Sequence, residues 1–244
     1  MWKRISAFLF DGILLSIAAV LFALGLSVLL GYDGYAAKVD SAYARYGEEY
    51  QVNLRLSSLE YEQLDETGKA NLQAAYDAMN ADQEARHALG VMMEMTLLIS
   101  SFGILLGFLL LEFTVPLLFK NGQTLGKKIF SLGVMHTSGV RLSAPMLFAR
   151  VILGKYAIET MVPVYILLMI FFGTIGVIGP IVIFLILILE AVVMIATHTN
   201  STIHDLLAKT VAVDIGSQMI FETKEDLIAY KEKLHAEKAA KATY

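Results

Sequence analysis

The sequence predicts an all-α membrane protein with four transmembrane helices, a helical extracytoplasmic cap and short cytoplasmic β-strands. Three observations predict this fold class. The chain of 244 residues is 57% hydrophobic and has a mean hydropathy of +0.62, which is too apolar for an ordinary soluble domain. Four segments are long and apolar enough to cross a bilayer. Lys and Arg are unevenly divided among the segments that connect them.

The four predicted spans are residues 1–30, 91–119, 147–172 and 175–197. The first is longer than the apolar core of a signal peptide and is followed by no small-residue cleavage site, so we interpret it as a retained helix. Few residues separate the last two spans, and glycines in this connection predict a tight turn.

The positions of Lys and Arg predict the orientation. Residues 31–90 contain five basic and eleven acidic residues, a balance of −6. The other fourteen Lys and Arg lie at the N-terminus, in or beside the loop 120–155, and after residue 197. The positive-inside rule places these three regions in the cytoplasm. We therefore expect a multi-pass protein of the cell membrane with both termini cytoplasmic.

Residues 31–90 predict an extracytoplasmic helical cap, because 36–50 and 59–89 have helix-forming composition and the second stretch continues into the next span. Seven of the eleven tyrosines lie here: Tyr32, Tyr35, Tyr43, Tyr46, Tyr50, Tyr61 and Tyr76. Tyrosine suits packing within the cap and contact with a partner equally well. We expect the former, and a contact with a second copy or another membrane protein stays an alternative.

Residues 120–146 predict a cytoplasmic loop with a β-hairpin. Residues 128–135 have the pattern of a strand, and 140–142 follow a turn as a short return strand.

Two further cytoplasmic segments follow the fourth span. Residues 198–216 contain a strand-like run at 209–214, which could pair with the first strand. Residues 217–244 mix Lys and Glu with leucine and predict a charged helix at the surface.

Each predicted span contains an acidic residue in its cytoplasmic half. These residues are Asp11, Glu112, Glu159 and Glu190. At about 1.5 Å per residue, each lies about 10 to 13 Å from the cytoplasmic end of its span, so the four could share one layer. Ionisable side chains inside spans commonly mark ion pathways. The layer is therefore a candidate binding site for protons or small cations.

Neighbouring cations support a structural alternative. Lys155 precedes Glu159 by four residues and Arg4 precedes Asp11 by seven, so each can lie on the helix face of its acid. The acids could instead pair with Arg4, Lys155, Arg150 or strand backbone and stabilise helix packing. Both interpretations stay open.

Other chemistries have weaker signals. Met92, Met93 and Met95 could bind a soft metal, but methionine is also ordinary filler in apolar segments. The chain has no cysteine and its five histidines show no ligand spacing, so we expect no metal or cofactor. His204 and Asp205 could act as acid and base on a lipid, but no nucleophile motif accompanies them. We expect neither enzymatic activity nor a nucleic-acid partner.

Three stretches, RISAFLFD at 4–11, GQTLGKKIFSLGV at 122–134 and HDLLAKTVAV at 204–213, resemble the RDD family of membrane proteins, named for an arginine and two aspartates. The resemblance places the family's arginine on Arg4, its aspartates on Asp11 and Asp205, and a further arginine on Arg150. The other motif positions are Gly122, Thr124, Gly126, Lys127, Lys128 and His204.

The resemblance implies a multi-pass domain, with transport such as cation/proton exchange suspected in some members and an assembly role in others. We therefore expect a secondary transporter of protons or small cations, which would need a homo-oligomer because four spans are few for alternating access. The alternative is a non-transporting scaffold that recruits a partner through its cap or tail. Asp11 is expected to be held by a basic or backbone donor, which leaves Glu112 and Glu190 for a function specific to this chain.

Overall fold

The computed structural model describes residues 2–119 and 121–242. The ends of the predicted segments at Met1, Lys120, Thr243 and Tyr244 lie outside the described residues. The chain divides into two compact units. One consists of Ala23–Phe102, and the other combines Met1–Phe22 with Gly103–Tyr244.

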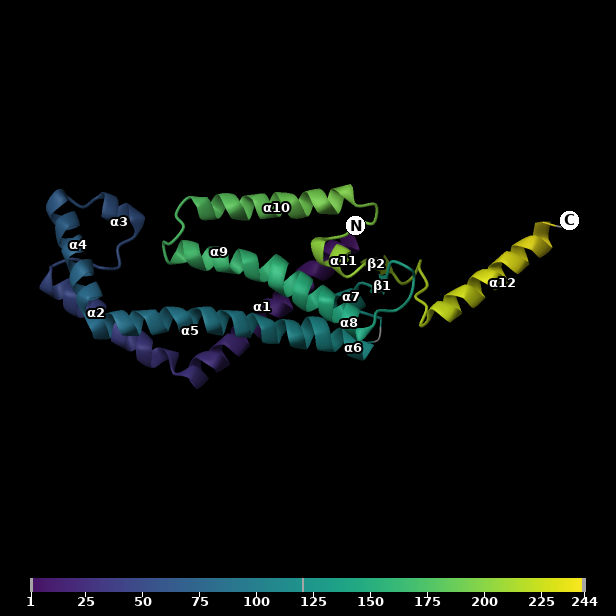
Figure 1. Ribbon diagram of the computed structural model, residues 1–244, viewed down its shortest axis with the longest axis horizontal. Helices are drawn as coiled ribbons and strands as arrows, with labels where there is room; N and C mark the ends of the chain where they lie inside the picture. The colour runs from purple at the N-terminus through teal and green to yellow at the C-terminus, as the bar shows by residue number, and fades with distance from the viewer. Residues whose placement is uncertain (1, 120, 243–244) are drawn as a thin grey trace. The chain divides into compact units, whose positions relative to one another are not determined.

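Four helices in the described part of the chain are long and apolar enough to cross a membrane (Figure 1). They are α1 (Trp2–Leu30), Gln83–Phe119, Ala144–Phe171 and α10 (Ile178–Ala196). Gln83–Phe119 comprises α5 (Gln83–Gly107), the π-helical segment η1 (Phe108–Thr114) and α6 (Val115–Phe119). Ala144–Phe171 comprises α8 (Ala144–Phe148), the π-helical segment η2 (Ala149–Met161) and α9 (Val162–Phe171). The expected helical fold with four membrane-spanning helices and a small sheet is confirmed, although the second helix begins at residue 83 rather than 91.

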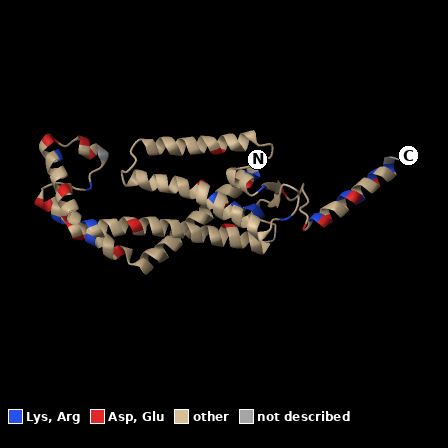
Figure 2. Cartoon of the chain, viewed as in Figure 1, with Lys and Arg blue, Asp and Glu red and all other residues tan. Residues whose placement is uncertain are grey.

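Large apolar side chains cover the outside of these helices. Phe8 on α1, Phe171 on α9 and Phe184 on α10 are each more than half exposed, and charged residues are almost absent from α9 and α10 (Figure 2). Such continuous apolar surface requires a bilayer rather than water around it.

The unit Ala23–Phe102 contains α2 (Tyr32–Glu49), α3 (Ser58–Glu62), α4 (Glu66–Ala81) and the first part of α5. Residues 59–89 are divided among α3, α4 and the start of α5. Ser57 caps α3, and the Asp65 side chain accepts from the Gly68 N–H and starts α4. Asp82 then accepts from Glu84 N–H at the start of α5. These caps favour three separate helices, α3, α4 and α5, over one continuous helix.

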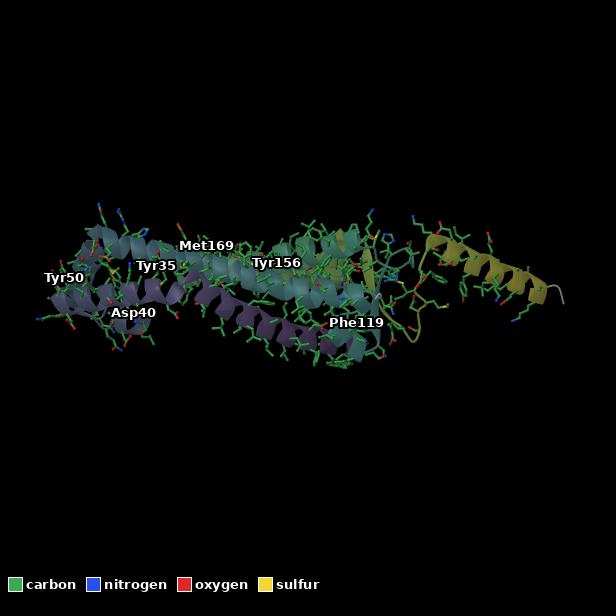
Figure 3. The ribbon with its side chains drawn as sticks, turned by 90° about the horizontal axis from the view of Figure 1, so that it is seen from below. Tyr35, Asp40, Tyr50, Phe119, Tyr156 and Met169 are labelled. Carbon is green, nitrogen blue, oxygen red and sulfur yellow. The ribbon has the colours of Figure 1, made fainter. Side chains whose placement is uncertain are left out.

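Tyrosines pack inside this unit. Tyr43, Tyr46 and Tyr76 contact a buried core that includes Ala42 and Met79. The Tyr76 hydroxyl donates to the Leu54 carbonyl at 2.6 Å, and Figure 3 labels Tyr35 and Tyr50 on the same unit. Tyr43, Tyr46 and Tyr76 thus pack within the unit, as predicted. A contact between the tyrosines and a partner stays a prediction.

In the other unit, α7 (Leu125–Ile129), β1 (Leu132–His136), α11 (Ile203–Leu207) and β2 (Thr210–Asp214) lie together (Figure 1). β1 and β2 pair antiparallel, from Leu132 opposite Asp214 to His136 opposite Thr210, as the pattern of the two runs suggested. The expected strand start at residue 128 is wrong, because Thr124 caps a helical turn and Ser131 reverses the chain at a φ of 56°. The expected return strand 140–142 is reduced to isolated bridges, from Arg141 to Met135 on β1 and from Val140 to Phe221.

The core of this unit lies between η1 and η2. Phe108 packs against Leu147 and Val151, and the Tyr156 ring meets Phe108 edge-on with centroids 5.8 Å apart (Figure 3). The chain ends in α12 (Lys224–Ala242), which agrees with the charged helix expected there.

Candidate functional site

Asp11 on α1 is held by the loop that follows the second span. Its carboxylate accepts hydrogen bonds from the Thr124 hydroxyl and, at 2.7 Å, from the Gly126 N–H. Lys127 Nζ lies 3.8 Å from the same carboxylate. A Cβ on Gly126 would stand 2.5 Å from the Ala7 carbonyl oxygen and 2.9 Å from Asp11 Oδ1. Only glycine lets the loop approach α1 this closely, so Asp11 has both the backbone donor and the basic neighbour that were expected.

Two other residues of this motif shape the loop and do not touch Asp11. Gly122 has a φ of +62°, and a Cβ there would lie 3.0 Å from the Val134 carbonyl oxygen. Lys128 Nζ lies 3.7 Å from the centre of the Phe119 ring, a cation–π contact. Figure 3 labels Phe119 at the end of α6.

Arg4 does not pair with Asp11, which was one of the pairings that the structural alternative allowed. Its guanidinium donates to the carbonyls of Thr199 and Ala212, while the preceding Lys3 pairs with Asp214 at 2.6 Å. Seven residues separate Arg4 from Asp11 by about 10 Å along the helix axis, and the loop donors already occupy the carboxylate. Arg4 therefore connects the start of α1 to β2.

Arg150 on η2 and Asp205 on α11 form a buried ion pair. Arg150 Nε and Nη2 donate to Asp205 Oδ1 at 3.1 and 2.9 Å, and the Thr210 hydroxyl donates to the same oxygen at 2.7 Å. Burial by itself raises the pKa of Asp205, but the Arg150 charge, the adjacent His204 and these hydrogen bonds lower it further than burial raises it. Asp205 is therefore a firmly ionised partner of Arg150.

His204 connects this ion pair to Glu159. Its backbone N–H donates to Glu159 Oε1 at 2.8 Å, its Nδ1 lies 2.6 Å from Glu159 Oε2, and its Nε2 lies 3.1 Å from Arg150 Nη2. Burial, followed by the Arg150 charge, lowers the pKa of His204 to about 4, although the Glu159 hydrogen bond opposes this. A neutral ring that donates from Nδ1 to Glu159 and accepts at Nε2 from Arg150 satisfies all three groups.

The pairing of Lys155 differs from the expectation. Lys155 Nζ lies 2.7 Å from Glu112 Oε2, and the two side chains are 13% and 5% exposed. The i,i+4 spacing had left a pair with Glu159 as one alternative. Lys155 on η2 instead crosses to Glu112 on η1.

Lys127 lies close to this pair. Burial and the Lys155 charge lower the pKa of Lys127 to about 8, while Glu112 and Asp11 act in the opposite direction. Together these groups form one connected set, which we call the charge network: Asp11, Lys127, Glu112, Lys155, Arg150, Asp205, His204 and Glu159.

Glu190 differs from the other three acids of the predicted layer. Its side chain is half-buried, and none of the described residues forms a hydrogen bond or ion pair with it. Its carboxylate lies within Coulombic range of Glu159. Donors from other segments thus form hydrogen bonds with Asp11, Glu112 and Glu159. No donor among the described residues forms one with Glu190.

Sequence reasoning missed Gly154 and the two π-helical segments. A Cβ on Gly154 would lie 2.5 Å from His204 Cβ and 2.8 Å from its Cα, so this glycine admits α11 against η2. A small residue one helical turn from Arg150 was the available signal for Gly154. The π-helical segments left no signal in the residue pattern. Among the described residues, no group of three or more His, Cys, Asp or Glu is arranged to hold a metal ion.

Comparison with known protein families gives a match to the RDD family over residues 1–209. No curated protein and no solved structure matches the chain. The match covers the four membrane helices and the entire charge network, and it ends before α12.

Proposed function

The chain belongs to the RDD family of membrane proteins, and from this premise we propose that it is a secondary transporter of protons or small cations in the cell membrane. One observation carries the proposal. Glu190 is a carboxylate inside a membrane helix with no hydrogen-bond or ion-pair partner among the described residues, and it lies within Coulombic range of the Glu159 carboxylate. A carboxylate in this position is costly unless it holds a proton or a cation.

Glu159 would couple this binding site to α11. Its two oxygens hold the backbone N–H and the Nδ1 of His204, and His204 contacts the Arg150–Asp205 pair. A cation between Glu190 and Glu159 would compete for the Glu159 charge and weaken its bonds to His204. The occupancy of the site would then change the attachment of α11 to η2.

The π-helical segments supply an element that can move in response. Glu112 lies on η1, and Arg150, Lys155 and Glu159 lie on η2. π-Helical turns are less stable than α-helical turns and occur frequently at functional sites. In this proposal the segments rewind as the ion pairs exchange, and two or more copies assemble because four helices offer little room for alternating access. The termini lie in the cytoplasm, as the Lys and Arg distribution indicates.

The test is flux in proteoliposomes with an imposed pH or sodium gradient. Wild-type protein should exchange protons or a small cation, and Glu190→Gln should reduce the rate at least about tenfold while leaving the fold intact, since no described partner of Glu190 is lost. The control is Glu94→Gln, the same change at an exposed acid of α5, which should transport normally. Absence of wild-type flux for H⁺, Na⁺ and K⁺, or full activity of Glu190→Gln, would refute the proposal.

A non-transporting scaffold is the second candidate. The observation in its favour is that none of the buried side-chain nitrogen and oxygen atoms in the described part of the chain lacks a hydrogen-bond partner. A fully satisfied network is what a structural role requires. In this case Glu112→Gln, which weakens the ion pair with Lys155, should lower thermal stability and abolish co-purification of a membrane-protein partner. A stable variant that keeps no partner would count against it.

A further inference from the structure

The C-terminal helix α12 lies beyond the family match and has almost no packing of its own. Leu227 is half-buried, and the other described side chains of α12 are exposed. The Phe221 ring, just before the helix, contacts Tyr230 with centroids 5.3 Å apart. A helix of nineteen residues gains little stability in water without a surface against which to pack.

The side chains of α12 are sorted by charge around the helix, although they alternate along it (Figure 2). At 100° per residue, six side chains spaced by three or four residues fall within an arc of about 100°. We call this arc the basic–leucine face: Lys224, Leu227, Lys231, Leu234, Lys238 and Lys241. Ile228, Tyr230 and His235 border it.

The opposite side of the helix carries every acid. Glu225, Asp226, Glu232 and Glu237 fall within an arc of about 140° centred opposite the basic–leucine face. The gaps between them are filled mainly by alanine, and Lys233 is the one lysine on this side. A helix that needed only solubility would not require this separation of charges.

We propose that α12 lies flat on anionic lipid headgroups, with its basic–leucine face toward the membrane that holds the four spans. The two leucines can enter the boundary between headgroups and acyl chains, and the four lysines can extend to the phosphates on either side of them. Each lysine near an anionic surface contributes about a fivefold gain in binding. The acids on the opposite side face water and avoid repulsion from the lipids.

A second copy of α12 is a poor occupant of the same face. Lys224, Lys231 and Lys238 repeat every seven residues along the stripe, so in a paired coil they would occupy the positions that pack between the two helices. Lysines packed there would repel one another. The negatively charged membrane is the better complement, and the fourth span already keeps α12 near its surface.

The experiment uses the full-length chain in nanodiscs. The sequence has no cysteine, so Leu234→Cys and Ala236→Cys each create a single labelling site, the first on the basic–leucine face and the second on the opposite side. An environment-sensitive fluorophore is attached, and its emission is recorded in nanodiscs of phosphatidylcholine alone and of phosphatidylcholine with one quarter phosphatidylglycerol. We expect a blue-shifted emission, quenchable by a lipid-borne quencher, only for the label at position 234 in the anionic discs.

Charge variants decide the cause of the shift. Combined Lys231→Gln and Lys238→Gln should lower the ratio of docked to free helix about 25-fold, from about fivefold per lysine, whereas the matched control Lys233→Gln should leave it unchanged. A shift at position 234 that persists in phosphatidylcholine alone or in detergent would indicate a protein contact and would overturn the proposal. Water-like emission at position 234 in the anionic discs would overturn it as well.

Discussion

The buried pair of Glu112 and Lys155 allows a prediction with a worked magnitude. At 2.7 Å between nitrogen and oxygen, Coulomb's law with an effective dielectric of about 20 gives an attraction of about 6 kcal/mol. Desolvation of both ions offsets much of this attraction, but removal of one partner leaves the other charge buried and costs about 3–5 kcal/mol. Each single substitution should therefore destabilise the protein strongly.

The surroundings of the pair predict which substitution is worse. In Lys155→Met, the Lys127 ammonium still attracts Glu112 and loses a repulsive neighbour, so the loss should lie near 3 kcal/mol, the low end of that range. In Glu112→Leu, the two lysines face each other without an acid between them, and the loss should approach about 5 kcal/mol. At about 2–4 °C per kcal/mol for a chain of this size, the Tm should fall by about 6–12 °C and 10–20 °C respectively.

The measurement is thermal unfolding in nanodiscs, followed by circular dichroism at 222 nm. The double variant Glu112→Leu with Lys155→Met should regain most of the lost Tm, because it removes both charges and both desolvation penalties. Lys233→Met on the exposed α12 helix is the control and should leave the Tm unchanged. If the double variant is as unstable as the sum of the single variants, or if Lys155→Met is the more damaging change, the reasoning fails.

Three further substitutions test the contacts between η2 and α11. Gly154→Ala should lower the Tm by several degrees, because its Cβ would lie 2.5 Å from His204 Cβ, whereas Gly12→Ala, with no atom within 4 Å of its added Cβ, should be neutral or stabilising. Arg150→Lys should cost about 2 kcal/mol in chemical denaturation, because a single ammonium nitrogen cannot occupy the positions of both Nε and Nη2, which contact Asp205, Thr210 and His204. The folded-state pKa of His204 is about 4, below the value of about 6.5 in the unfolded chain, so the unfolded state takes up the proton first as the pH falls. Stability should therefore decrease from about pH 6.5 to pH 4, and His204→Gln should lack this part of the decrease in a series of Tm measurements.

The spans and the kind of donor that meets Asp11 could be predicted, although the loop that supplies this donor could not. Long apolar runs have few structural alternatives, and a carboxylate inside a span predicts a basic or backbone donor. Donation by Gly126 to Asp11 realises that expectation. The antiparallel pairing of β1 with β2 was within reach for the same reason, since each is a short strand-like run at the end of a span.

The partner of Lys155 could not be predicted, because it lies on another segment of the chain. Spacing rules such as i,i+4 consider one helix by itself, whereas Lys155 pairs with Glu112 on η1 and Glu159 pairs with His204 on α11. No residue type marks a π-helix as proline marks a kink. Likewise, the first predicted strand was placed too early, because Ile129 and Phe130 suit a strand although they end the helical turn that Thr124 caps.

The proposed ion-binding role makes use of the balance between acids and cations in and beside the membrane helices. The charge network contains four acids, three cations and His204, whose lowered pKa keeps it neutral near pH 7. With Glu190, the acids exceed the cations by two when all are ionised. A scaffold would not need this excess negative charge, which glutamine at the half-buried position 190 would reduce. A protein that binds and releases protons or cations requires such an excess, because the missing positive charge is the one supplied by its substrate.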